Sequence, residues 1–150
     1  MSGAATESIL LEESADDEGN ARCVAHVFGT EFAYSSALGW MHWTGTYWKI
    51  DPSEAEVDQA ILAVLRQRRL LAVTAGKEAV VKATPGSTRR VRDCKALFRS
   101  MVDVAPEDFD MHPDELNVAN GVVNLRSGVL RPHSSCDRFT YCLDTPYNED

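Results

Sequence analysis

The most evident functional candidates in this sequence are basic side chains concentrated in one stretch of the chain. Ten of the fifteen bases lie in residues 66–99, where only Glu78 and Asp93 oppose them. Local potential, more than total charge, decides where a phosphate backbone can rest. The run therefore predicts one basic face on a protein whose formal net charge is −8.

Five bases of this run are the candidates for contact with DNA or with another subunit. They are Arg89, Arg90, Arg92, Lys95 and Arg99. Arg92, Lys95 and Arg99 follow the spacing i, i+3 and i+7, which places them on one side of a helix. Three interpretations stay open: a solvated helix face, phosphate contact, and pairing with acids. Those acids could belong to a neighbouring subunit or to residues 1–20, which carry six acids and no base.

Three tryptophans, Trp40, Trp43 and Trp48, form a second candidate site. In proteins that bind single strands, an aromatic ring stacked on a base contributes ~1–3 kcal/mol. The alternative is that the rings form the core of a small sheet. Strand alternation places Trp40 and His42 on one face and Met41 and Trp43 on the other, so one set could be exposed.

Metal and acid–base chemistry have weaker support. His133, Cys136 and Cys142 could share a metal ion, but their spacing fits no common zinc motif and a fourth ligand is not evident. Four acids could supply a carboxylate pair for a nuclease: Asp103, Asp108, Asp110 and Asp114. Acids in a proline-containing loop are more typical of caps and turns. There is no GxxxxGK[ST] motif and no Ser/His/Asp or Cys/His set. We expect no metal, no cofactor and no enzymatic activity, with a metal-dependent enzyme as a weak alternative.

Composition fits one ordinary domain with reduced thiols. The chain has 150 residues, 44% hydrophobic and 25% charged, and a domain of this size needs no disulfide or metal to be stable. No apolar run reaches the roughly 18 residues of a membrane span, and no secretory signal is visible. The four cysteines form no CxxC pair. We therefore expect a cytoplasmic protein that does not interact with membranes.

The sequence patterns around these residues predict an α+β domain. Residues 1–19 are expected to be a loose acidic tail, followed by a single domain over residues 20–150. Asn20 is expected to cap a short helix that ends at an αL Gly29. Residues 31–51 predict an aromatic three-stranded meander, and a helix capped by Asp51 or Ser53 follows through about residue 71.

The second half predicts one or two further helices and a terminal hairpin. Residues 72–86 are ambiguous between a bent helix and separate helices because breakers interrupt them. Ser87 or Thr88 is expected to open a helix to about Val102, with Met101 among its buried residues. Asn120-Gly121 lies between two apolar runs and predicts a type I′ hairpin turn.

Two separated motifs resemble a known family. The run Leu116–His133, LNVANGVVNLRSGVLRPH, is similar to the signature of a domain in phage, plasmid and poxvirus primase–helicases, where it precedes a superfamily-3 helicase motor. Its matching positions are Asn117, Asn120, Gly121, Leu125 and Gly128. The segment from Asn20 to Gly29 resembles the opening helix of that domain. The tryptophans with Gly39 and Gly45 resemble its GW…W.G..W meander. The resemblance spans about residues 20–147.

This resemblance implies a non-catalytic module of a phage or plasmid DNA-replication primase–helicase, in the cytoplasm of a bacterial host. Its implied partners are a helicase motor domain or subunit, single-stranded or forked DNA, and further copies of the chain. Only the family implies ring assembly. No motor motif is present, so we expect either a fragment or a free-standing relative. The alternative is a free-standing interaction protein that binds a helicase or another replication protein without contacting DNA.

Overall fold

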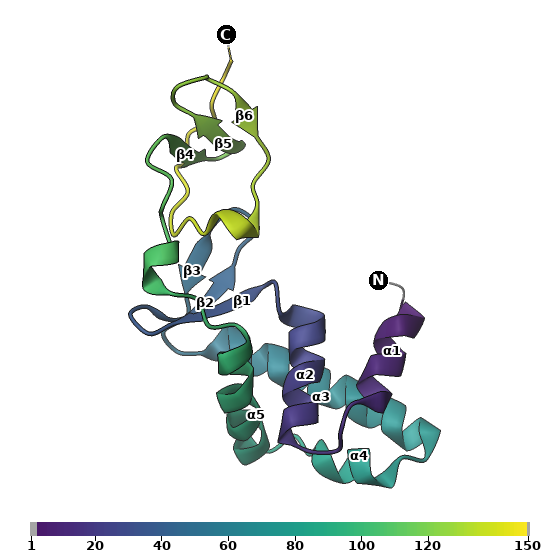
Figure 1. The fold of residues 1–150 in the computed structure, drawn as a ribbon. Helices are drawn as coiled ribbons and strands as arrows, with labels where there is room; N and C mark the ends of the chain where they lie inside the picture. Colours follow the sequence, from purple (N-terminus) through teal and green to yellow (C-terminus); the bar gives the residue numbers. More distant parts are fainter. Residues whose placement is uncertain (1–2, 150) are drawn as a thin grey trace. The chain divides into compact units, whose positions relative to one another are not determined.

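The computed structural model describes residues 3–149, which form two compact units (Figure 1). The helical unit contains the described residues up to Gly29 and Ser53–Asp103. The β unit contains Thr30–Pro52 and the described residues from Val104 onward. N-terminal helices, a three-stranded antiparallel sheet, further helices and a second three-stranded antiparallel sheet follow in this order and confirm the expected α+β class. Within the described residues, no helix is long and apolar enough to cross a membrane.

Five helices make up the described part of the helical unit. They are α1 (Gly3–Glu12), α2 (Asp17–Phe28), α3 (Ala55–Ala75), α4 (Glu78–Ala83) and α5 (Thr88–Met101). α3 contacts each of the others, and α2 also packs on α5. The ambiguous stretch after residue 71 is therefore the end of α3 followed by a separate short helix. Val91, Cys94 and Phe98 of α5 are buried as expected, whereas Met101 is 41% exposed, contrary to expectation.

The helix ends differ from the sequence expectation at three of four caps. Ser87 caps α5 as expected, and its hydroxyl accepts from the amide of Arg90 at 3.2 Å. The cap of α2 is Asp16, not Asn20, and Gly29 ends that helix in an αR conformation, not αL. α3 begins after Glu54, which has a positive φ of 60° and no capping side-chain bond. Neither Asp51 nor Ser53 caps it.

Residues 3–12 form helix α1, contrary to the expected loose tail. Leu10 of α1 is fully buried, and α1 contacts α3. The guanidinium of Arg68 on α3 donates to the carbonyls of Leu10, Glu13 and Ser14. These bonds join groups more than fifty residues apart, so local sequence patterns do not reveal them.

The β unit begins with the expected aromatic meander. Its strands are β1 (Phe32–Ser35), β2 (Gly39–Trp43) and β3 (Trp48–Ile50), paired antiparallel in the order β1-β2-β3. Gly39 and Gly45 adopt positive φ values of 79° and 104°, as the tight turns require. Ala33, Met41, Trp48 and Phe109 form the core of this unit.

The terminal hairpin is a three-stranded antiparallel sheet. Its strands are β4 (Glu115–Val118), β5 (Gly121–Asn124) and β6 (Leu130–Arg131). Val118 pairs with Gly121, so Ala119 and Asn120 form the turn. Neither has a positive φ, so the expected type I′ turn is wrong. Gly121 has a φ of 151°, and a Cβ there would lie 2.3 Å from the carbonyl oxygen of Arg131.

Candidate functional site

The five bases proposed as a contact surface all lie on α5, but they are not equivalent. Arg89 and Arg92 reach into solvent, with side chains 85% and 74% exposed. They share one carboxylate, Asp93, whose oxygens lie 3.7 Å from each Nε. Exposed pairs at this distance hold a side chain weakly. Arg99 is also exposed.

Arg90 and Lys95 are instead bound within the helical unit. The guanidinium of Arg90 lies 2.8 Å from Asp17 of α2. The ammonium of Lys95 donates to Glu54 at 2.8 Å and to Asp58 at 2.9 Å, and only 17% of its side chain is exposed. Burial works against the charged form of Lys95, but the hydrogen bonds to Glu54 and Asp58 raise its pKa. These two bases join α5 to α2 and α3.

A hollow of about 530 Å³ lies beside the exposed arginines, between α3 and the start of α5. Leu62 and Val91 supply its apolar wall, and Gln59, Ser87 and Thr88 supply neutral polar groups. Arg89, Arg92 and Lys95 also line it, with Asp58 as the acid. The hollow can therefore hold an anionic group next to two exposed guanidiniums.

The structure also places a second set of bases on the helical unit, and sequence reasoning did not single these out. Arg66, Arg69, Lys77 and Lys82 come from α3, α4 and the residues between them. Within residues 3–149, none of the four forms an ion pair with a carboxylate. The signal that could have found them is the near absence of acids in residues 66–82, where Glu78 stands alone.

The tryptophans lie mostly inside the β unit. Trp40 is 4% exposed and Trp48 is 1% exposed, whereas Trp43 is partly exposed. The guanidinium carbon of Arg138 lies 4.7 Å from the centre of the Trp48 ring. Burial lowers the pKa of Arg138. Trp43 packs on Trp48 with ring centroids 5.6 Å apart. Of the three rings, Trp43 has the most surface available for a base.

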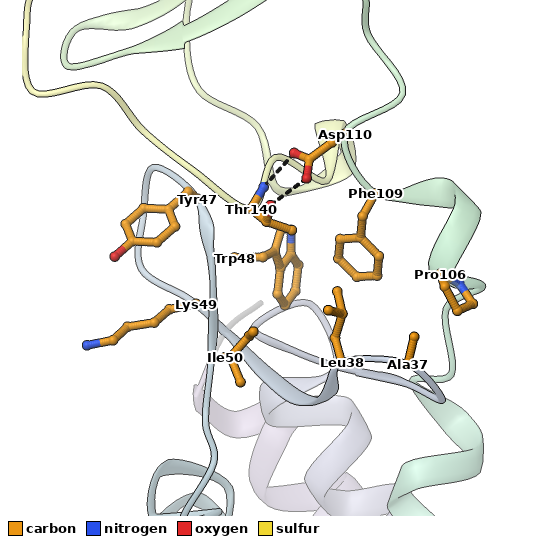
Figure 2. Close-up of a pocket in the computed structure, with 10 residues that line it drawn as sticks. All are labelled: Ala37, Leu38, Tyr47, Trp48, Lys49, Ile50, Pro106, Phe109, Asp110 and Thr140. Carbon is orange, nitrogen blue, oxygen red and sulfur yellow. Dashed lines mark hydrogen bonds between the residues drawn. The ribbon is translucent and has the colours of Figure 1, made fainter.

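Figure 2 shows a second hollow, of about 480 Å³, in the β unit. Leu38, Trp48 and Phe109 form its apolar side. Asp110 lies at its edge with a φ of 56° and accepts hydrogen bonds from the amide and hydroxyl of Thr140. This carboxylate therefore holds two segments of the chain together, which is a structural task and not that of a free catalytic base.

The motif asparagines connect separate segments of the β unit through hydrogen bonds. Asn117 is fully buried, and its amide nitrogen donates to the carbonyls of Thr46 and Tyr141, both at 2.7 Å. Asn120 forms a reciprocal pair with the peptide of Tyr147, both bonds being 2.9 Å long. Gly128 has a φ of 72° in the next turn. Leu125 is 60% exposed, and nothing in the described structure explains its place in the motif.

The groups considered for a metal have other contacts. His133 lies 2.9 Å from Oδ1 of Asn117 through Nδ1 and 3.3 Å from the carbonyl of Ala119 through Nε2. The thiol of Cys142 donates to the carbonyl of Val118. In the part of the chain that the structure describes, no group of three His, Cys, Asp or Glu residues could hold a metal ion.

Charge divides unequally between the two units. The β unit has four bases against eleven acids, whereas the helical unit has eleven bases against twelve acids. The acidity of the chain is therefore mainly a property of the β unit. The excess of acids in the β unit repels a polyanion, so the exposed bases of the helical unit are the more favourable contact.

A family model described as D5 N terminal like matches residues 21–150. A comparison with curated proteins gave no match. Because the family match covers most of the sequence, the chain belongs to the D5 N terminal like family, whose members precede the helicase in primase–helicase proteins.

Proposed function

We propose that this member of the D5 N terminal like family is a non-catalytic module of a phage or plasmid primase–helicase that couples or assembles the helicase motor and contacts DNA through α5. The motor is a domain of the same polypeptide or a separate subunit. The setting is the cytoplasm of the bacterial host. Family membership supports the placement beside a helicase; DNA contact is an inference from surface chemistry.

The observation that carries the DNA contact is the state of Arg89 and Arg92. Their side chains are 85% and 74% exposed and share a single carboxylate at 3.7 Å. Few bonds must break before these guanidiniums can pair with phosphates, and guanidinium binds phosphate in a bidentate geometry. Arg90 and Lys95, by contrast, would have to leave ion pairs of 2.8 Å. The candidate contact therefore narrows to Arg89, Arg92 and the exposed Arg99.

The tryptophans contribute less to this proposal. Trp40 and Trp48 are buried, so their rings are not available to a base unless the β unit opens. Partly exposed Trp43 remains a candidate for stacking. Because the β unit is strongly acidic, we place the bound DNA strand on the helical unit. We therefore expect Trp43→Ala to change the affinity for DNA little.

Fluorescence anisotropy with a labelled oligo-dT of about 20 nucleotides tests the DNA contact, because this length exceeds the usual site of a small binding module. At low salt, Arg89→Ala/Arg92→Ala should lower the affinity. Arg126→Ala is the matched control, because Arg126 is 81% exposed and pairs with Asp114 in the β unit. Equal affinity of wild type and the double variant would contradict the DNA contact at α5.

The second candidate function is an interaction protein that binds a helicase or another replication protein without contacting DNA. The two tightly paired bases of α5 and the acidic β unit favour it, because both lower the attraction for a polyanion. Size-exclusion chromatography with a separately purified primase–helicase motor distinguishes the two functions. Co-elution with the motor together with no measurable oligo-dT binding supports the interaction protein.

A further inference from the structure

A groove with an apolar floor lies where α3 ends and α4 begins. Its volume is about 530 Å³. The residues that line it all belong to the helical unit: Ala72, Val73, Gly76, Glu78, Val81 and Lys82. None of them lines the hollow beside α5. The groove is therefore a separate feature of the helical unit.

Leu70 and Val73 extend the apolar floor along α3. They are 70% and 59% exposed, the highest values for large apolar side chains in the described helical unit. Arg66, Arg69, Leu70 and Val73 follow the spacing i, i+3, i+4 and i+7, so they share one face of α3. Exposed apolar side chains gathered beside a groove are typical of an interaction site, not of an ordinary solvated face.

Within residues 3–149, the bases around this groove form no ion pair with a carboxylate, and Glu78 is the one acid among the residues that line it. Arg69 and Lys77 donate to main-chain carbonyls, those of Val81 at 3.1 Å and Leu11 at 3.2 Å, respectively. Arg66 and Lys82 form no ion pair within the described residues. On α5, by contrast, Arg89, Arg90, Arg92 and Lys95 each lie within 4.0 Å of a carboxylate of the same chain. We call the surface formed by Arg66, Arg69, Leu70, Val73, Lys77, Val81 and Lys82 the α3–α4 surface.

The chain itself contains one example of an acidic, apolar helix bound to α3. α1 has the sequence GAATESILLE, which carries two acids and no base, and it buries Leu10. The carbonyl of Leu10 accepts a hydrogen bond from Nε of Arg68 at 2.8 Å. α1 leaves Leu70 and Val73 uncovered. α3 therefore has a second face, also apolar and basic, that no described residue covers.

We propose that the α3–α4 surface binds an acidic amphipathic helix of a partner protein. Apolar side chains at i, i+3, i+4 and i+7 of that helix would cover Leu70, Val73 and the groove, the usual mode for a helix in an apolar groove. Its carboxylates would face Arg66, Arg69 and Lys82. A phosphate backbone would pair with these bases but leave Leu70 and Val73 in water. An acidic amphipathic helix would both pair with the bases and cover the apolar side chains of the α3–α4 surface.

The test is titration of the whole chain with a designed helical peptide of about 18 residues, long enough to form a helix in water. The peptide carries leucines at i, i+3, i+4 and i+7 and glutamates at the positions that flank this apolar stripe on both sides; its control has lysine at every glutamate position. The acidic peptide should bind and the basic peptide should not. Leu70→Glu and Lys82→Glu should each weaken binding by about ten-fold or more, as for side chains central to an interface.

Leu125→Glu is the matched control, because Leu125 is 60% exposed and lies in the β unit. It should leave binding unchanged. Failure of the acidic peptide to bind, equal binding of both peptides, or insensitivity to Leu70→Glu would overturn the proposal. Displacement of the peptide by oligo-dT would assign the surface to DNA. Self-association of the chain that Leu70→Glu abolishes would assign the surface to a second copy, and either result also overturns the proposal.

Discussion

Nη1 of Arg68 lies 2.6 Å from Oδ1 of Asn20, and both side chains are fully buried. Asn20 also donates to the carbonyl of Ala83 at 2.8 Å, so the pair connects α2, α3 and the end of α4. The remaining donors of Arg68 bind carbonyls at the end of α1 and just after it. The buried pair of Arg68 and Asn20 therefore connects four of the five helices in the described helical unit.

Replacing Arg68 should be the most damaging single change in the helical unit. Arg68→Ala leaves several buried acceptors without donors and removes a large packed side chain. We expect a loss of about 3 kcal/mol in the free energy of unfolding, measured by urea denaturation. Arg66→Ala, an exposed neighbour on the same helix, should change it by less than about 0.5 kcal/mol. Equal effects of the two substitutions would contradict this role of Arg68.

The two motif asparagines of the β unit should differ in their effect on stability. Asn117→Ala removes two hydrogen bonds from a fully buried side chain to carbonyls and leaves Nδ1 of His133 without its partner. We expect a cost of about 3 kcal/mol. Asn120 is exposed, so loss of its pair with Tyr147 should cost about 1 kcal/mol. Thermal unfolding followed by circular dichroism can rank the two, and the reverse order would contradict the assignment.

The four cysteines should separate into two reactive classes. Burial raises the pKa of Cys23 to about 11 and that of Cys94 to about 12, and both side chains are buried. Cys136 is exposed and Cys142 is partly exposed. The thiolate is the reactive form, so native protein at pH 8 should react with Ellman's reagent at Cys136 and Cys142 only. All four should react in denaturant. Fast labelling of Cys23 or Cys94 in native protein would contradict the packing of α2 on α5.

Asp16, which caps α2, should make the helical unit sensitive to acid. Hydrogen bonds from the Ser14 hydroxyl and the Gly19 amide lower the pKa of Asp16 below its ordinary value. Its contribution to stability is present above pH 4 and is lost as the pH falls through the lowered pKa. Asp16→Ala should cost about 1 kcal/mol at neutral pH. Asp16→Asn keeps the cap, so its stability should resemble wild type at neutral pH but depend less on pH below about 4. An Asp16→Asn variant with the wild-type acid profile would contradict this mechanism.

The parts of the fold that sequence predicts are those fixed by local signals. Ser87 before an amphipathic run predicts α5, and aromatic residues around Gly45 predict the β2–β3 turn. α1 and the true role of Asn20 escape such reasoning because a distant arginine, Arg68, determines both. Asn20 has the chemistry of a cap, yet its place in the fold is the interior.

As with the fold, local sequence signals predict the candidate site only in part. Periodicity places the five bases on α5, but it does not show which of them are free to bind a partner. Arg90 pairs with Asp17, seventy-three residues earlier, and Lys95 pairs with Glu54, forty-one residues earlier. Only tertiary structure separates these two from exposed Arg89 and Arg92. The same limit hides the groove at α4, because its apolar floor is made by the packing of two helices.

The salt dependence of oligo-dT affinity tests whether α5 binds the phosphate backbone through Arg89 and Arg92. Each phosphate contact on a single strand contributes about −0.7 to the slope of log K against log salt concentration. We expect a steep negative slope for wild type, a slope shallower by about 1.4 for Arg89→Ala/Arg92→Ala, and the wild-type slope for Arg126→Ala. An identical slope in wild type and the double variant, or no salt-dependent binding at all, would contradict it.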